Sequence, residues 1–389
     1  MLNPVPFDVG RLRDRALVPI GMKLGAGERL TVADGATLFR SHDLLGVGAM
    51  ADAANRARHG DVVTFAANQH INPTNICVLR TTCAFCGYAR LPKESGAYRY
   101  SLEQVMAEAE QADNGITREF HIVGGLDMQA GLEYYTTMFR ALKARLPHVH
   151  IKALTAVEIA HIARIEKMTW TDVLIALREA GLDTLPGGGA ETFSEAVRDE
   201  IAGKKLGGAD YINVHRAAHN LGIRSNCTML YGHVESIEDR MQHLQMLRDL
   251  QDETGGFLAY IPLAYHPDDN ELGKRLKREG TATTGFDDLR NLAVGRLFLD
   301  NFEHIKSHWI MVTSAVSQVA LHFGVNDIEG TVVREKIYHA VGAPTPQGMT
   351  LPQLLKLIRG AGKIPAERDS FYNVLRTFEH EEAPAVAAA

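Results

Sequence analysis

Short apolar stretches alternate with amphipathic helical segments over most of this chain, and this alternation restricts its possible folds more than any other feature. Each stretch is short enough to be one buried strand, and the stretches begin near His70, Phe120, His150, Gly181, Gly222, Gly256 and His304. Successive starts are 30 to 50 residues apart, the length of a strand followed by a helix. A closed or nearly closed TIM-type (β/α) barrel is therefore the predicted fold. A doubly wound open sheet is the alternative, but no G-x-G-x-x-G follows a predicted strand.

Helix start signals support this alternation. Ser101 and Gln104 form a capping box ahead of one helix, and Ser236 opens another. The N-terminal segment shows helical spacing and little strand character. We therefore predict three regions, which are a helical N-terminal extension over residues 1–65, the barrel over 66–320, and a C-terminal extension over 321–389 that ends in a frayed tail, EHEEAPAVAAA.

Charge and composition narrow the class of protein. The chain has 41 lysines and arginines against 47 aspartates and glutamates, a net charge of −6, which gives no reason to expect nucleic acid or an anionic membrane as a partner. No apolar run reaches spanning length, and the first residues lack the apolar core of a signal peptide. Four cysteines are too few for a disulfide scaffold. We expect a soluble protein of the reducing cytoplasm.

Polar and glycine-rich segments follow the predicted strands. In chain order these segments are TNICVLRTTCAFC, GGL, TAVE, PGGGAE, LYGH and YHPDD. In a parallel barrel, the carboxyl ends of the strands meet at one rim, and the chemistry of such barrels takes place there. One rim of the predicted barrel is therefore the expected functional face.

Three cysteines, Cys77, Cys83 and Cys86, lie within ten residues on the first of these segments. Three thiolates on one loop can hold a zinc ion or three corners of an iron–sulfur cube. Structural zinc needs a fourth ligand, and the remaining cysteine, Cys227, lies 141 residues downstream of Cys86. A cube with three protein ligands leaves one iron open, where S-adenosylmethionine (SAM) can bind and be split into an alkyl radical. Zinc completed by a histidine, and Cys77 as a buried core thiol, are the alternatives.

Beyond the cysteines, the chain resembles a known family. The segments that carry the resemblance are NPTNICVLR…CAFCGYAR, HIVGGL, HIKALTAVEI, GLDTLPGGGAE, RSNCTMLYGH, LQDETGGFLAYIPLAYHP and QVALHFGVNDIEGTVV. They are similar to segments of the aminofutalosine (aminodeoxyfutalosine) synthases, radical SAM enzymes of the futalosine route to menaquinone. LPGGGAE is shared with dehypoxanthine futalosine cyclases and deazaflavin synthases, whereas TAVEI with FLAYIPLAYHP points to the synthases. One departure is the spacing, since five residues rather than three separate Cys77 from Cys83, which leaves the conformation of residues 80–82 open.

The resemblance implies a radical SAM barrel whose [4Fe–4S] cluster is held by Cys77, Cys83 and Cys86 and converts SAM to methionine and a 5′-deoxyadenosyl radical. In the family, this radical adds to the enol-ether double bond of 3-(1-carboxyvinyloxy)benzoate, and rearrangement with loss of the carboxyl carbon gives aminodeoxyfutalosine. SAM is then a co-substrate, and the implied partners are an aromatic carboxylate and an electron donor such as flavodoxin or ferredoxin. Two rivals are a cyclase that abstracts hydrogen and a zinc-dependent barrel hydrolase or binding protein.

The resemblance also implies which residues meet the cofactor. Phe85 resembles the aromatic position beside the adenine, or is an ordinary apolar loop residue. Gly124 and Gly125 resemble the two-glycine turn whose backbone receives the methionine end of SAM, although Leu126 stands where the family often has an acid. Glu158 is a candidate for binding SAM and for catalysis, or only an acid in the first turn of a helix. A glycine run whose amides can form an anion nest adds Gly188, Gly189 and Glu191.

Candidates for contact with the substrate come from three of the rim segments. Tyr231 and His233, in LYGH, are the expected catalytic residues together with Glu158. Arg80, His233 and His266 are the expected ligands of the substrate carboxylates. Each histidine is alternatively a satisfied polar residue at the rim with no part in the chemistry.

Overall fold

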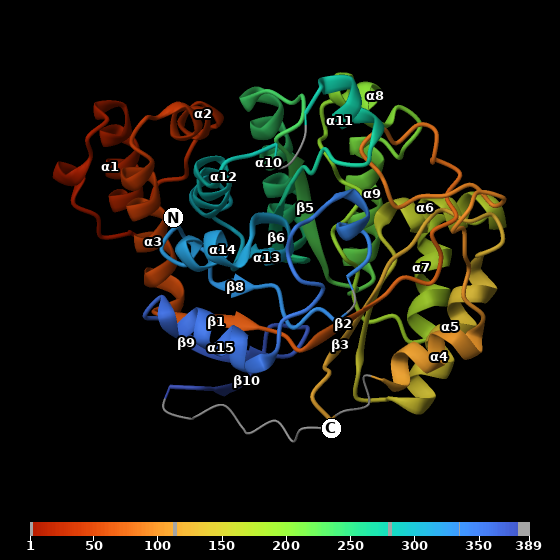
Figure 1. Cartoon of the computed structure of the whole chain (residues 1–389). Coiled ribbons are helices and arrows are strands. Elements are labelled where there is room, and N and C mark those ends of the chain that lie inside the picture. Colours follow the sequence, from red (N-terminus) through yellow and green to blue (C-terminus); the bar gives the residue numbers. More distant parts are fainter. Residues whose placement is uncertain (1–2, 112–114, 279–281, 334, 380–389) are drawn as a thin grey trace.

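The computed structural model describes residues 3–111, 115–278, 282–333 and 335–379, and its strands are almost all parallel (Figure 1). Seven strands form one sheet in the order β10-β9-β1-β8-β7-β6-β5, and three form another in the order β2-β3-β4. Every neighbouring pair is parallel except β9 with β10. In chain order the strands are β1 (Val62–Phe65), β2 (Asn68–Ile71), β3 (Glu119–Ile122), β4 (His150–Ala153), β5 (Ser225–Tyr231), β6 (Phe257–Ala264), β7 (His304–Ser307), β8 (Asp327–Ile328), β9 (Ile364–Arg368) and β10 (Val374–Thr377).

Isolated bridges join the two sheets into a ring. Beside β4, Thr184 pairs with Lys152, and Leu185 pairs with Ser225 of β5. On the opposite side, Gln69 of β2 pairs with Val333, while β1, which directly precedes β2, pairs with β8. The predicted (β/α) barrel is confirmed. Six of the seven apolar stretches are strands, and the seventh, after Gly181, contributes the two bridging residues.

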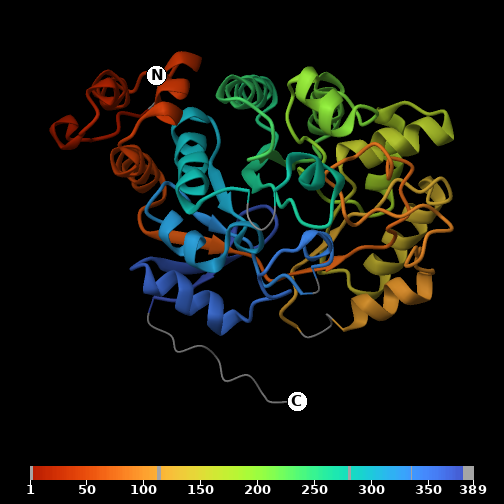
Figure 2. The ribbon, with the colours of Figure 1, turned by 45° about the horizontal axis from the view of Figure 1, so that its top comes forward.

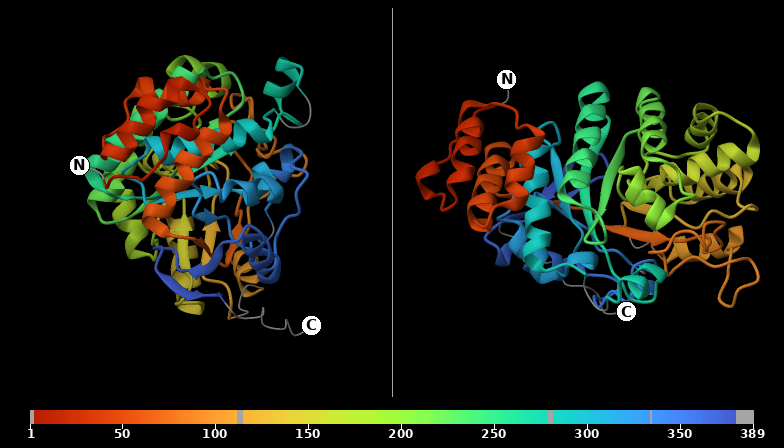
Figure 3. Two further views of the ribbon diagram at one scale, coloured as in Figure 1. Left: turned by 90° about the vertical axis from the view of Figure 1, so that its left-hand side faces the viewer. Right: turned by 90° about the horizontal axis from the view of Figure 1, so that it is seen from above.

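Helices cover the outside of the strands, as Figure 3 shows from above. The capping box at Ser101 is confirmed, and the helix opened by Ser236 has one in which Asp239 is the third helical residue. Among the described residues, no helix is long and apolar enough to cross a membrane. The helices are α1 (Val18–Ala26), α2 (Val32–Arg40), α3 (Leu44–His59), α4 (Leu102–Glu110), α5 (Leu132–Arg145), α6 (Ala156–Glu166), α7 (Trp170–Glu179), α8 (Glu195–Ala202), α9 (Gly208–Asn220), α10 (Ile237–Thr254), α11 (Glu271–Leu276), α12 (Gly285–Phe298), α13 (Trp309–Val312), α14 (Ser314–Ala320) and α15 (Leu351–Gly360), with 3-10 turns η1 (Val9–Arg11), η2 (Arg15–Leu17) and η3 (His339–Val341).

The N-terminal helices pack beside the barrel rather than over its mouth. In Figures 1 and 2, α1, α2 and α3 lie at one flank, where α2 contacts α10 and α12 and α3 contacts α12. Gly35 permits the close approach of α2, because a Cβ there would overlap the side chain of Met241 on α10. Arg29 extends the contact with ion pairs to Asp252 at 2.5 Å and Asp300 at 2.7 Å.

The hydrogen-bonded wall extends past both expected limits of the barrel, residues 66 and 320. β1 begins at Val62, and β8 lies between β7 and β1 in the sheet. β9 then adds to the outer edge of β1, and α15 packs against β9. The sequence did not reveal β8 because a two-residue strand shows no periodicity. The frayed tail expected at the C-terminus lies outside the described residues from position 380 onward.

Candidate active site

The barrel encloses a cavity of about 280 Å³ at the carboxyl ends of its strands. All three clustered cysteines line it, as do all the residues expected to meet SAM, namely Phe85, Gly124, Gly125, Glu158, Gly188, Gly189 and Glu191. Of the residues expected to meet the substrate, His266 lines the cavity, whereas Arg80, Tyr231 and His233 do not. Closure of the wall therefore brings together predicted site residues that are as far apart in the chain as Cys77 and His266.

The thiol loop follows β2 and contains one tight turn. The amides of Thr82 and Cys83 both donate to the carbonyl of Leu79, at 2.9 Å each, so residues 79–83, which lie within the long spacing, form a tight turn. The Cys86 amide donates to the Cys83 carbonyl at 3.3 Å. The loop is held from outside by Ala84, whose amide donates to Ile201 of α8 at 2.8 Å. The long spacing is thus accommodated within the loop, and all three thiols are free.

A largely buried lysine that the sequence did not reveal lies beside these thiols. Lys205, between α8 and α9, pairs with Glu191 at 2.5 Å and lies 5.2 Å from the centre of the Phe85 ring. Burial raises the pKa of the Cys83 thiol to about 12, and the charge of Lys205 opposes that rise. Burial also raises the pKa of Cys77. Without a bound metal, the thiols of Cys77 and Cys83 are therefore protonated at neutral pH.

The thiol loop fits an iron–sulfur cluster. Its three free thiols face one cavity, and thiolates are the usual ligands of such clusters. In a cube each thiolate binds its own iron, so the three sulfurs need not converge on one point. Within the part of the chain that the structure describes, no three His, Cys, Asp or Glu side chains converge as ligands of a single ion. The nearby ammonium of Lys205 offsets part of the negative charge that a thiolate-bound cluster brings.

The two-glycine turn after β3 is packed tightly against the strand that leads to the thiol loop. A Cβ on Gly124 would lie 2.8 Å from the Thr74 carbonyl oxygen, and one on Gly125 would overlap the Ile76 carbonyl. The Gly125 amide donates to Thr74 at 2.9 Å, and the Gly124 amide donates to Glu158 Oε1 at 2.9 Å. Because both amides are engaged inside the protein, a ligand would meet the carbonyl side of this turn.

Glu158 caps a helix and also lines the cavity. It is the third residue of α6, and its Oε2 accepts from the Thr155 amide and hydroxyl at 2.7 Å each, which completes a capping box. It also lines the cavity and is fully buried there. Burial raises its pKa to about 7, although the hydrogen bonds from Thr155 and Gly124 oppose that rise. Glu158 therefore fixes the position of the glycine turn relative to the start of α6.

The glycine run before α8 is shaped by close contacts on both sides. A Cβ on Gly187 would lie 2.5 Å from Cα of Cys227, so this backbone packs directly on β5. Gly189 and Glu191 have positive φ angles of 89° and 49°, and glycine adopts such angles most readily. The run turns back over the cavity and presents Glu191 to Lys205. Cys227 itself lies in the wall, outside the cavity lining, as expected for a strand residue.

Three predicted site residues, Tyr231, His233 and Arg80, point away from the cavity. Their positions correct the expectation that LYGH and the thiol loop supply side chains that contact the substrate. Tyr231 donates to Asp288 of α12 at 2.8 Å, because alternation along β5 directs Leu230 into the cavity and Tyr231 outward. His233 hydrogen-bonds the Leu230 carbonyl through Nε2 at 3.1 Å, and its Nδ1 lies 3.1 Å from Glu235, so its ring is held at the rim outside the cavity lining. Arg80 pairs with Glu94 at 3.3 Å in the loop itself. His266 lines the cavity, and its Nε2 hydrogen-bonds the carbonyl of Met311 at 3.0 Å.

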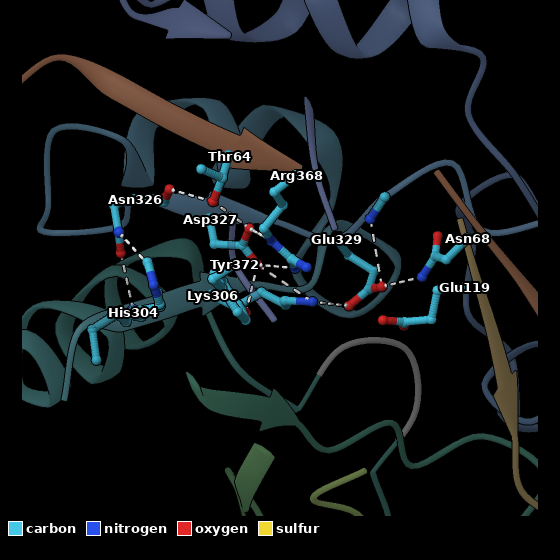
Figure 4. Close-up of polar contacts among 12 residues, drawn as sticks. Thr64, Asn68, Glu119, His304, Lys306, Asn326, Asp327, Glu329, Arg368 and Tyr372 are labelled. Atoms are coloured by element: carbon cyan, nitrogen blue, oxygen red, sulfur yellow. Dashed lines mark hydrogen bonds and ion pairs between the residues drawn. The ribbon is translucent and has the colours of Figure 1, made fainter. Parts of the chain in front are cut away.

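Charged and imidazole side chains on the strands, or directly after them, also line the cavity, and the sequence analysis missed them. Figure 4 shows Lys306 of β7 between Asp327 and Glu329, with Arg368 of β9 bound to Asp327. The signal was a charged or imidazole residue within several of the apolar strands, as in EFHI, HIKA and HIKS. The cavity-lining members of this group are His70, Glu119, His121, Lys152, Lys306, His308 and Glu329.

Comparisons with known proteins agree with this geometry. The model of the radical SAM superfamily matches residues 71–247, and that of the CofH/MqnC C-terminal region matches residues 254–381. The chain is 44% identical to aminodeoxyfutalosine synthase of Thermus thermophilus, over 96% of this chain and 99% of that protein. It is 42% identical to aminodeoxyfutalosine synthase of Streptomyces coelicolor, over 92% and 93%. The crystal structure of methylornithine synthase has the same fold, with a TM-score of 0.70 and 17% identity over 89% of this chain and 97% of that one.

The barrel and its thiol loop are thus those of a radical SAM enzyme, whose cofactors are a [4Fe–4S] cluster and SAM. Within that superfamily, the chain belongs to the family of the aminodeoxyfutalosine synthases, as its identity to two of them over nearly the whole length shows. The zinc alternative has no support from these findings.

Proposed function

We propose that this protein joins the 5′-deoxyadenosyl group of SAM to 3-(1-carboxyvinyloxy)benzoate and so makes aminodeoxyfutalosine for menaquinone biosynthesis. The carbon–sulfur bond of SAM breaks, a carbon–carbon bond to the alkene forms, and the carboxyl carbon leaves as bicarbonate after a rearrangement that consumes water. Reactants and products all have paired electrons, so the one electron that enters on cleavage of SAM leaves again when the carboxyl carbon is lost.

The observation that carries the proposal is the gathering of the three thiols and both glycine segments around one cavity, in a chain 44% identical to an aminodeoxyfutalosine synthase. Cys77, Cys83 and Cys86 are the proposed ligands of three irons, which leaves the fourth iron for SAM. When bound, the cluster supplies the electron that cleaves SAM to methionine and the carbon radical.

The protein's own residues have positioning tasks. Glu158 holds the turn at Gly124 in place, and the ion pair of Lys205 with Glu191 fixes the second glycine segment beside the Phe85 ring. Apolar side chains cover much of the remaining lining and exclude water from the radical carbon, among them Leu79, Val123, Leu126, Val157, Ile261 and Leu263. Holding the radical and the alkene together in such a site converts a bimolecular step into an effectively unimolecular one.

The proposed setting is the cytoplasm, where the thiols remain reduced. A small electron carrier such as flavodoxin or ferredoxin is the proposed reductant, because cleavage of SAM begins with the transfer of a single electron.

The test is an anaerobic product assay. The protein is purified without oxygen, reconstituted with iron and sulfide, and supplied with SAM, 3-(1-carboxyvinyloxy)benzoate and a strong reductant. We expect a product with the mass of aminodeoxyfutalosine, formed together with methionine. Release of free 5′-deoxyadenosine with dehypoxanthine futalosine, without the adduct, would instead identify a cyclase. A colourless, zinc-loaded protein after the same preparation would end the radical interpretation.

A further inference from the structure

Every lysine that lines the cavity is already paired with a glutamate that lines it too. The three pairs are Lys152 with Glu119 at 2.6 Å, Lys205 with Glu191 at 2.5 Å and Lys306 with Glu329 at 3.2 Å. Among the described residues of the lining there is no arginine. Buried ion pairs of this kind are electrically balanced, so the cavity has no spare ammonium or guanidinium for an anionic substrate.

Unpartnered imidazoles are available instead. The Nε2 atom of His70 and the Nδ1 atom of His308 are buried without a hydrogen-bond partner in the described structure, and the two residues are 8% and 7% exposed. The ring of His121 stacks on that of His70, with their centres 4.6 Å apart. The three residues reach the cavity from β2, β3 and the residue after β7. A buried polar atom without a partner is unfavourable by about 1–3 kcal/mol, which favours a ligand that supplies the missing hydrogen bond.

We propose that His70, His121 and His308, here called the histidine trio, form the subsite for a carboxylate of the aromatic substrate, and that one proton is taken up there when the substrate binds. The inference rests on the proposed function, since it assigns the place where that substrate is held. The trio fits a carboxylate because the rings of His70 and His121 stack and His308 is close enough to His70 for their charges to interact. An imidazolium is also the one kind of cation that the lining can still provide.

The environment of the trio determines that substrate binding takes up a proton rather than releases one. Burial lowers the pKa of each histidine of the trio, so all three are neutral at pH 7 before the substrate arrives. A carboxylate placed against the trio favours the imidazolium and draws in a proton. Affinity is then strongest at low pH and weakens by up to about tenfold per pH unit as the pH rises. The titratable and charged groups that face the trio are Glu119, Lys152, Lys306, Glu329, Glu335 and Tyr338.

Two kinds of variant separate the charge from the hydrogen bond. His70→Gln and His308→Asn keep a neutral amide where the unpartnered nitrogen lies, whereas His70→Leu and His308→Leu remove the hydrogen-bonding group. His42→Asn is the matched control, because His42 is 79% exposed on the surface. Thermal unfolding of each reconstituted variant verifies that it is folded before binding is measured.

The experiment is calorimetric titration of the reconstituted protein with 3-(1-carboxyvinyloxy)benzoate, without SAM, from pH 6 to 8.5 in two buffers of different ionisation enthalpy. We expect uptake of about one proton in the wild type and in His42→Asn. In the leucine variants, we expect Kd to rise about 10- to 100-fold at pH 6.5, as for loss of a charge-assisted hydrogen bond. In the amide variants, we expect part of the affinity to be retained and the pH dependence to be reduced.

The product assay separates failure of this inference from failure of the proposed function. Wild-type protein that makes aminodeoxyfutalosine, together with leucine variants that bind as tightly and take up as many protons as the wild type, would overturn the trio as a carboxylate subsite and leave the function standing. Wild-type protein that neither binds the substrate nor makes the product would overturn both.

Discussion

A buried ion pair between Arg368 and Asp327 helps to anchor the C-terminal hairpin to the barrel. Removing half of that pair tests whether the hairpin is part of the wall. Arg368 of β9 binds both oxygens of Asp327, at 2.7 and 2.9 Å, and both side chains are at most 1% exposed. The guanidinium of Arg368 also lies 3.7 Å from the ring centre of Tyr372. Although burial raises the pKa of Asp327, the charges of Arg368 and Lys306 lower it to about 2. We predict that Arg368→Met strongly destabilises the protein.

The magnitude follows from what the substitution leaves behind. Asp327 stays buried with one cation, Lys306 at 3.3 Å, which it shares with Glu329. Breaking a buried pair from one side is unfavourable by about 3–5 kcal/mol. A chain of 389 residues has an unfolding entropy of about 0.8 kcal/mol per kelvin, so the melting temperature falls by about 4–6 °C.

Thermal unfolding of the reconstituted enzyme, followed by circular dichroism, measures this shift. The matched control is Arg376→Met in the same hairpin, because Arg376 pairs with Glu367 at 2.9 Å but is itself 45% exposed, and the buried Glu367 keeps a second partner, Arg118 at 3.1 Å. We therefore expect Arg376→Met to lower stability by about 1 kcal/mol or less. The double variant Asp327→Asn with Arg368→Met should be more stable than Arg368→Met alone, since no uncompensated charge remains. Equal shifts for Arg368→Met and Arg376→Met would refute the reasoning.

Three further predictions concern the site. Cys83→Ser should lose most of the iron and the visible absorption of the reconstituted protein. Cys227→Ser should keep both, because Cys227 lies in the barrel wall outside the cavity lining. Equal iron contents in the two variants would contradict the ligand assignment. Because burial raises the pKa of Glu158 to about 7, its contribution to stability is full below pH 4.5 and is lost as the pH rises through 7, by up to about 3 kcal/mol; Glu158→Gln should therefore flatten the pH dependence of the melting temperature, and an unchanged pH profile would count against it. Tyr231→Phe should lower the free energy of unfolding by about 1–2 kcal/mol, because it removes the hydrogen bond to Asp288. It should leave KM for the aromatic substrate unchanged, and a raised KM would show that Tyr231 contacts the substrate.

Local patterns along the chain were enough to predict the barrel and its cofactors. The spacing of the apolar stretches reflects strand and helix lengths, which are local properties, and all seven predicted positions lie in the wall. Cys77, Cys83 and Cys86 are within ten residues of one another, so the loop that carries them presents its thiols together in any compact fold. The family resemblance, which rests on contiguous segments, is confirmed for the same reason.

The tertiary structure alone decided which polar side chains face the cavity. A shift of one residue along β5 separates Leu230, which lines the cavity, from Tyr231, which does not, and the sequence cannot set that phase when both faces of a strand are buried. The partner of Lys205 is Glu191 on a different segment, and His70 meets His121 only because β2 and β3 are neighbours in the wall. These contacts form across space after the ring of strands has closed, and no spacing along the chain encodes them.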